Sequence, residues 1–180
     1  MANPNEVLSF WFEELKPDQW FSKDPELDSL MRSRFSSLHQ QASRCELYTW
    51  RETIQGRLAE IIVLDQFSRN MFRNDPKSFA QDPLALALAQ EAIHTGLQSQ
   101  LSTSQKVFLY MPFSHSESLA MHDIAVQLFS EKGMEINLDY EYRHRKILER
   151  FSRYPHRNQV LGRASTPEEI EFLKLPESGF

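Results

Sequence analysis

The stretch RLAEIIVLDQFSRNMFR, residues 57–73, decides the fold because it is apolar on both faces of a helix. At about 100° per residue, one face takes Leu58, Ile61, Ile62, Asp65, Arg69 and Phe72, and the other takes Val63, Leu64, Phe67 and Met71. A helix with two apolar faces lies in the interior of a protein. Burying a carboxylate or a guanidinium is costly unless it is paired. This helix therefore either holds an internal Asp65–Arg69 ion pair or lines a polar pocket.

The bulk composition is that of a globular protein. The 180 residues are enough to bury a sizeable core, and we expect a single helical domain over residues 1–180. A lone cysteine, Cys45, excludes an internal disulfide, and the sequence has neither a basic leader nor an apolar run of membrane-spanning length. These features predict a cytoplasmic protein.

The charge is unevenly distributed along the chain. The net charge of −5 argues against binding to nucleic acid or to an anionic membrane. Residues 143–163, however, carry seven Lys or Arg and one acid, Glu149. An acidic chain with one basic segment is more typical of a protein that holds a small anion or an acidic partner patch.

Helix signals recur along the chain, and strand signals are nearly absent. Start signals stand at Asp24-Pro25, Thr53, Asp82-Pro83, Ser102, Ser114-x-x-Glu117, Asn137 and Thr166-Pro167-x-Glu169. Stop signals stand at Lys16-Pro17, Gly96, Pro112 and Lys132-Gly133. The sequence therefore predicts an all-α protein of about eight helices joined by short turns.

The first polar cluster lies on the central helix and comprises Asp65, Gln66, Arg69, Asn70 and Arg73. One interpretation is structural, with Asp65 paired to Arg69 and Arg73 at the helix C-terminus, where cations are favoured. The other is functional, with the two arginines forming a fork for a carboxylate or phosphate. Gln66 and Asn70 would then add neutral hydrogen bonds to the same ligand.

The second cluster follows the helix that carries His144. Arg153, His156, Arg157 and Asn158 stand around Pro155, which fixes the backbone at the helix end. A histidine on an apolar face, such as His144, is most often a core residue rather than a ligand or a base. A connector alone does not require three polar residues of different type directly after the proline, His156, Arg157 and Asn158, so this turn is a candidate ligand site.

The third cluster is His115-Ser-Glu117, at a predicted helix start. Capping explains Glu117, but it leaves His115 beside helix-terminal N–H groups that favour anions. No nucleotide-binding, G-x-S-x-G or H-E-x-x-H motif is present, and no pair of histidines has the spacing of a helical metal site. We therefore expect no metal and no cofactor.

Five segments span nearly the whole chain: FWF (10–12), LDQFSRN (64–70), FLYMPFSHSE (108–117), RFSRYPHRN (150–158) and LGRASTPEE (161–169). Together they resemble a widespread family of small bacterial proteins, with relatives in fungi and plants, known as a domain of unknown function. The resemblance implies antiparallel helical hairpins related to tetratricopeptide-repeat proteins, and it implies no activity. Ser68 stands where the family's run usually has proline, so the helix is expected to continue past it.

The family motifs coincide with the polar clusters. We therefore expect one pocket formed by Asp65, Arg69, His115, His144, His156 and Arg157. The preferred function is a binding module that holds a small anion or a peptide carboxylate, with the arginines as a clamp. The alternative is a hydrolase-type enzyme with His156 or His144 as general base and Asp65 orienting it.

RNA binding through residues 143–163 is the last-ranked function. The nearby aromatic residues are Tyr140, Tyr142, Phe151 and Tyr154, which we expect to be core residues rather than stacking platforms. The expected partner is thus a small anionic molecule or a peptide, and neither nucleic acid nor a membrane. The sequence predicts no oligomeric state.

Overall fold

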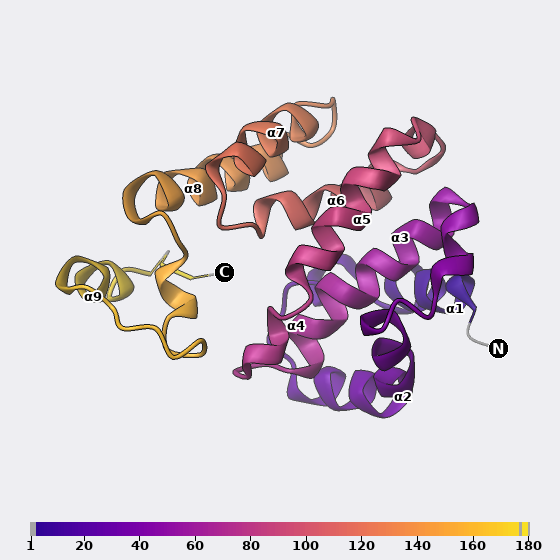
Figure 1. The fold of residues 1–180 in the computed structure, drawn as a ribbon, viewed down its shortest axis with the longest axis horizontal. Coiled ribbons are helices and arrows are strands. Elements are labelled where there is room, and N and C mark those ends of the chain that lie inside the picture. The colour runs from indigo at the N-terminus through magenta and orange to yellow at the C-terminus, as the bar shows by residue number, and fades with distance from the viewer. Residues whose placement is uncertain (1–2, 177, 180) are drawn as a thin grey trace.

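The computed structural model describes residues 3–176 and 178–179, and every regular element within them is helical. The α-helices are α1 (Pro4–Ser9), α2 (Pro25–Ser43), α3 (Ile54–Ile62), α4 (Ser68–Met71), α5 (Asp82–His94), α6 (Thr103–Ser114), α7 (Leu119–Phe129), α8 (Glu135–Phe151) and α9 (Pro167–Leu173) (Figure 1). A π-helical turn, Val63–Phe67, joins α3 and α4 into one helix. The all-α class is confirmed, and the tetratricopeptide-like packing stays a prediction.

Local capping explains several helix boundaries. The Asp24 carboxylate accepts from the N–H groups of Glu26 and Leu27 at the start of α2. Thr53 caps α3 by accepting from the Gly56 N–H at 3.0 Å. Thr166 and Glu169 form the reciprocal capping box of α9. These starts agree with the sequence signals.

The helix from Ile54 to Met71 is central, as predicted. It contacts α1, α2, α5 and α6, and Phe67 lies fully buried in the main core. The Phe67 ring lies 4.9 Å from that of Phe35 and 5.8 Å from that of Trp11, measured between centroids. Ser68 lies within the helix, which continues to Met71 as expected.

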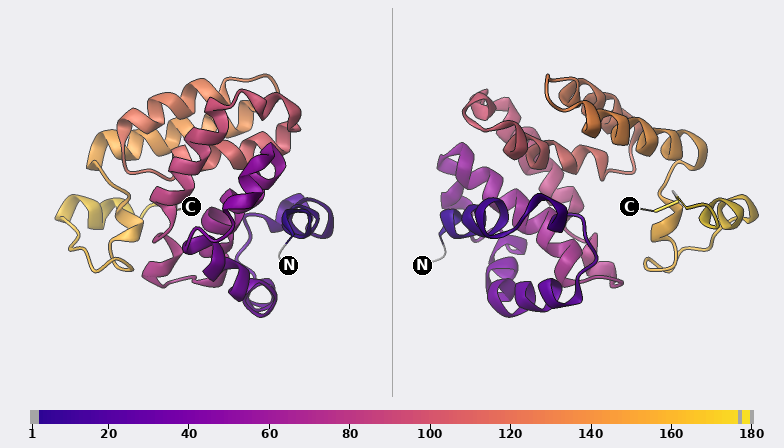
Figure 2. Two further views of the ribbon diagram at one scale, coloured as in Figure 1. Left: turned by 45° about the vertical axis from the view of Figure 1, so that its right-hand side comes forward. Right: turned by 180° about the vertical axis from the view of Figure 1, so that it is seen from behind.

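The C-terminal part of α8, the segment at Tyr154 and α9 form a smaller second core. Helix α7 packs on α6 and α8, and α9 lies beside the 3₁₀ turn Pro155–Arg157 at one end of the molecule (Figures 1 and 2). The buried residues of this second core are Ile147, Leu148 and Tyr154, with Phe151 and Phe172 packed against them.

Two helix boundaries differ from the prediction. Helix α6 runs through Pro112 to Ser114, so the predicted stop at Pro112 was wrong. The last turn survives because the His115 N–H donates to the Met111 carbonyl at 3.0 Å. Helix α8 begins at Glu135 with Met134 as its N-cap, so Asn137 lies in its first turn and is not a cap.

The predicted capping box Ser114-x-x-Glu117 was also wrong. Helix α7 begins at Leu119, and the Ser114 hydroxyl donates to Glu141 instead, at 2.5 Å. Glu117 accepts two hydrogen bonds from Arg163. Both side chains are used by partners that are distant in sequence.

No helix in the described part of the chain combines the length and the apolar character that crossing a membrane requires. The cytoplasmic location stays a prediction.

Candidate functional site

Asp65 is the buried carboxylate of the site, and it lies in the π-helical turn. Its side chain is 1% exposed, and its Oδ1 accepts from His115 Nδ1 at 2.7 Å and from Arg69 Nη1 at 3.2 Å. Gln66 donates to Oδ2. Burial alone would raise the pKa of the Asp65 carboxyl, but Arg69 and His115 outweigh it and hold that pKa well below its usual range. Asp65 is therefore ionised.

Asp82 links the central helix to the C-terminal turn. Its two oxygens accept from Arg69 at 2.8 and 3.0 Å, and Oδ2 also faces Arg157 Nη1 at 3.3 Å. Asp82 is the first residue of α5, and its side chain binds these arginines rather than the helix N-terminus. The Asp82-Pro83 pattern predicted the start of α5, but it did not predict the ion pairs of Asp82 with Arg69 and Arg157.

Arg157 is the most enclosed cation of the site, with a side chain 6% exposed. Its guanidinium carbon lies over two rings, 4.5 Å from the Phe79 centroid and 4.8 Å from that of Tyr154. Nη2 donates to the His115 carbonyl at 2.9 Å. Among the described residues, its buried Nε has no hydrogen-bond partner. Burial, and then the charge of Arg69, lower the pKa of Arg157.

Tyr154 brings the remaining histidines together. Its ring centroid lies 5.6 Å from that of His156 and 6.2 Å from that of His144. Burial is the main cause that lowers the pKa of each of these histidines to about 3, and the charge of Arg157 adds to it. Both rings are therefore neutral at neutral pH.

The six residues predicted to form one pocket are thus connected. Asp65 holds Arg69 and His115 directly, and Asp82 joins Arg69 to Arg157. Tyr154 then joins Arg157 to His144 and His156. Spacing in the sequence gave no signal for Asp82, Phe79 or Tyr154, although Tyr154 lies inside one of the family-like segments.

A second buried network supports the Tyr154 side of the site. His122 Nδ1 donates to Glu141 at 2.6 Å, and both of these side chains are fully buried. The Tyr154 hydroxyl donates to the Ser114 carbonyl at 2.5 Å. These bonds tie α6, α7 and α8 to the C-terminal turn.

Glu117 belongs to the edge of the site. It accepts from the Tyr154 N–H at 2.7 Å and from both terminal nitrogens of Arg163. Burial opposes ionisation, but these hydrogen bonds lower the pKa of the Glu117 carboxyl. Glu117 therefore holds the backbone from which the Arg157 turn starts.

Four predicted ligand-binding residues have other partners. Asn70 and Arg73 bind Asp28 on α2. Arg153 pairs with Glu169, which also accepts from Asn158. These side chains pair within the protein, and nothing places them at the edge of Arg157.

The basic segment is largely neutralised by neighbouring acids. Its exposed arginines pair with carboxylates: Arg143 with Asp139, Arg145 with Asp123 and Glu149, and Arg150 with Glu168. The expectation that Tyr140 and Tyr142 are core residues was wrong, because they are 53% and 47% exposed. They lie on the solvent side of α8.

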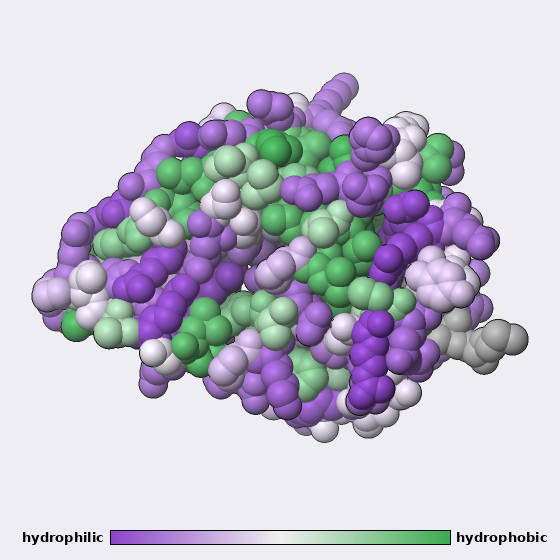
Figure 3. Space-filling view, viewed as in Figure 1, coloured by the Kyte–Doolittle hydropathy of each residue, from purple (hydrophilic) through white to green (hydrophobic). Residues whose placement is uncertain are grey.

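The site opens towards solvent. Arg69 is 20% exposed, while Asp82 and His115 are each 12% exposed. Figure 3 shows a narrow hollow between the C-terminal elements and the rest of the molecule.

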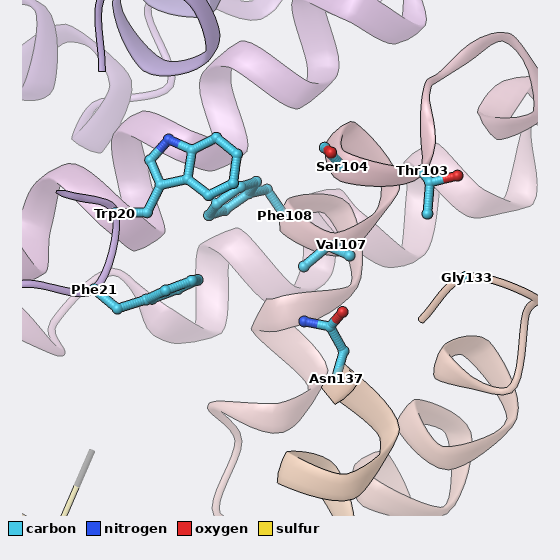
Figure 4. A pocket seen from close by; sticks show the side chains of 8 residues that line it. All are labelled: Trp20, Phe21, Thr103, Ser104, Val107, Phe108, Gly133 and Asn137. Atoms are coloured by element: carbon cyan, nitrogen blue, oxygen red, sulfur yellow. The ribbon is translucent and has the colours of Figure 1, made fainter. Parts of the chain in front are cut away.

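A separate apolar pocket of about 150 Å³ lies beside the N-terminus of α6 (Figure 4). It is lined by Trp20, Phe21, Thr103, Ser104, Val107, Phe108, Gly133 and Asn137. None of these side chains is charged, so this pocket does not offer an anion an ion pair. In residues 3–176 and 178–179, no three His, Cys, Asp or Glu side chains gather as metal ligands.

Comparison with known proteins places the chain in a family. A family model described as bacterial protein of unknown function, DUF924, matches residues 7–177. The chain belongs to this family. The resemblance seen in the sequence motifs is thereby confirmed.

A solved structure from the bacterium Agrobacterium tumefaciens, described as a protein of unknown function, has the same fold. It superposes with a TM-score of 0.90 at 41% sequence identity, over 98% of this chain and 97% of that chain. No curated protein matches the chain. Within DUF924, the function of this chain therefore has to be argued from the site.

Proposed function

We propose that this protein binds a small anion, or the carboxylate end of a peptide, at the edge of Arg157. The observation that carries the proposal is the buried Nε of Arg157, which has no acceptor among the described residues. A buried N–H without a partner costs about 1–3 kcal/mol. A carboxylate or phosphate oxygen would supply the acceptor, and the guanidinium charge would strengthen the bond.

The guanidinium is held in one orientation without a ligand. The Phe79 and Tyr154 rings pack against it, while Asp82 and the His115 carbonyl fix its terminal nitrogens. A side chain that is already ordered loses little entropy when a ligand binds. This preorganisation favours binding of a small ligand.

A thermal-shift screen tests the proposal with formate, phosphate and short peptides as probes. A ligand at 100 times its dissociation constant stabilises the folded state by about 2.7 kcal/mol. Arg157→Lys keeps the charge but lacks the planar fork, so the shift should disappear. Arg153→Gln, which removes the pairing with Glu169 and the hydrogen bond to the Ala164 carbonyl, serves as the matched control and should keep the shift.

Two results would overturn the proposal. One is the absence of a shift with every anion on the wild-type protein. The other is a shift that survives unchanged in Arg157→Lys.

A hydrolase is the second candidate, supported by the contact between His115 and Asp65. His115 Nδ1 donates to the buried carboxylate at 2.7 Å, the arrangement in which an aspartate orients a histidine for proton transfer at Nε2. Histidines with a pKa of about 3, such as His144 and His156, are weak bases at neutral pH. The general base would therefore be His115.

Hydrolysis of p-nitrophenyl acetate and p-nitrophenyl phosphate tests this second candidate. His115→Gln should abolish turnover, while His94→Gln, an exposed change on α5, should not. Turnover that persists in His115→Gln would exclude the proposed role.

A further inference from the structure

The charges around Arg157 already balance without a ligand. The ion pairs match three arginines to three carboxylates: Arg69, Arg157 and Arg163 to Asp65, Asp82 and Glu117. A bound anion would therefore add a negative charge that no cation of the site compensates. Uncompensated charge is penalised strongly in a partly buried position. A second positive charge must accompany the anion.

The imidazoles of His144 and His156 are the groups that can supply this charge. Both lie against Tyr154, whose ring covers one face of Arg157. The titratable and charged groups around them are Arg69 of α4, Asp82 of α5, His115 and Glu117 after α6, His122 of α7, Glu141 of α8, and Arg157 and Arg163 of the C-terminal turn. Burial and the neighbouring cations keep these rings neutral. The negative charge of a bound anion offsets the effect of the cations and so favours protonation of a ring.

The contacts of Arg157 also restrict the shape of the ligand. The Nε N–H lies in the plane of the guanidinium and has no acceptor among the described residues, so a ligand that binds it approaches in that plane, beside the Phe79 and Tyr154 rings. A planar carboxylate suits this in-plane edge. A doubly charged tetrahedral anion brings a second charge that the matched arginines do not neutralise.

We infer that the edge of Arg157 takes a monocarboxylate together with one proton, which settles on the imidazole of His144 or His156. The site discriminates against doubly charged tetrahedral anions. This inference rests on the proposed anion binding and narrows it to one class of ligand. The carboxylate belongs either to a small acid or to the end of a peptide chain.

Isothermal titration calorimetry tests the inference. The probes are formate, a tripeptide with a free carboxyl end, the same tripeptide amidated, and sulfate. Titrations at about pH 7.5 and about pH 5.5, where the carboxyl groups stay ionised, are run in buffers of different ionisation enthalpy. The dependence of the heat on the buffer reports the protons taken up.

We expect a monocarboxylate to bind with net proton uptake and to bind at least about threefold more tightly at the lower pH, because linked equilibria are reciprocal. Sulfate should bind at least about tenfold more weakly, a difference of about 1.4 kcal/mol. Preference for the free over the amidated tripeptide, and over formate, identifies a peptide end. Preference for formate identifies a small acid.

Variants separate the two roles within the site. His144→Gln combined with His156→Gln should lose the proton uptake and bind the monocarboxylate more weakly at both pH values. Arg157→Lys should lose binding altogether, and Arg153→Gln should behave as wild type.

The failures of the two proposals are distinguishable. Binding of sulfate as tight as that of formate, or carboxylate binding without proton uptake, overturns this inference and leaves anion binding intact. No binding heat with any probe at either pH overturns the proposed function and the inference together.

Discussion

Acidification will destabilise this protein between about pH 6.5 and pH 5 because His144 and His156 are buried as neutral rings. Their pKa values lie at about 3 in the folded protein. A histidine in an unfolded chain titrates near pH 6.5. Below that pH the unfolded chain binds protons that the folded chain does not. The stabilising contribution is thus fully present above about pH 6.5 and is lost as the pH falls towards 3.

The size of the effect follows from these pKa values. At about pH 5, the free energy of unfolding falls by about 2 kcal/mol for each histidine, or about 4 kcal/mol for both. This is a large part of the roughly 5–15 kcal/mol typical of a folded domain. Carboxylates with lowered pKa, such as Glu117, lose their contribution only below about pH 4.5. The loss of stability between about pH 6.5 and pH 5 therefore comes from the histidines. These include His39, because burial also lowers its pKa.

Urea unfolding followed by the fluorescence of the three tryptophans measures this dependence. His144→Gln combined with His156→Gln should remove most of the pH dependence of the free energy of unfolding between about pH 6.5 and pH 5. His94→Gln, on the exposed surface of α5, should leave it unchanged. A double variant that loses stability as steeply as the wild type would refute the assignment of the slope to these two rings.

Three substitutions test the packing and the ion pairs. Gly56→Ala should lower the free energy of unfolding by at least about 2 kcal/mol, because its Cβ would lie 2.0 Å from the Trp50 carbonyl oxygen. An unchanged melting temperature in thermal unfolding would contradict this close approach. Phe67→Ala should cost about 3–5 kcal/mol in urea unfolding because the ring is fully buried, and a loss below about 1 kcal/mol would contradict its place in the core. Asp82→Asn should lower the free energy of unfolding by about 3–5 kcal/mol because it removes the carboxylate that faces Arg157. Glu168→Gln, at an exposed ion pair, should change the free energy of unfolding little. Equal effects of the two substitutions would contradict the buried role of Asp82.

Local signals were sufficient to predict much of the fold. Asp24, Thr53 and Thr166 cap their helices with their own side chains, so the information lies within three residues of each helix start. The alternation of apolar faces likewise placed the central helix in the core. Gly96 adopts a φ of 72° after α5, where the sequence predicted the end of that helix.

Long-range pairing explains what the sequence did not reveal. Ser114 and Glu117 match a capping pattern, yet their partners, Glu141 and Arg163, lie 27 and 46 residues further along the chain. Asp82 looked like a helix start, and its partners are 13 and 75 residues away. Local patterns contain no information on such pairs, so the shared site was predicted from residue type and motif alone.

The small size of the C-terminal core has a consequence for how the site is reached. Its buried hydrophobic residues, among those described, are Ile147, Leu148 and Tyr154, so this part has far less apolar contact than the main core. Regions of low contact density open locally at a lower free energy than the whole molecule. Backbone amides of the second core should therefore exchange with deuterium before those of α3. Each such opening would separate Arg157 from Asp82 while Asp65 and Arg69 stay in place. The rate of ligand entry would then be set by the rate of local opening at this end of the molecule.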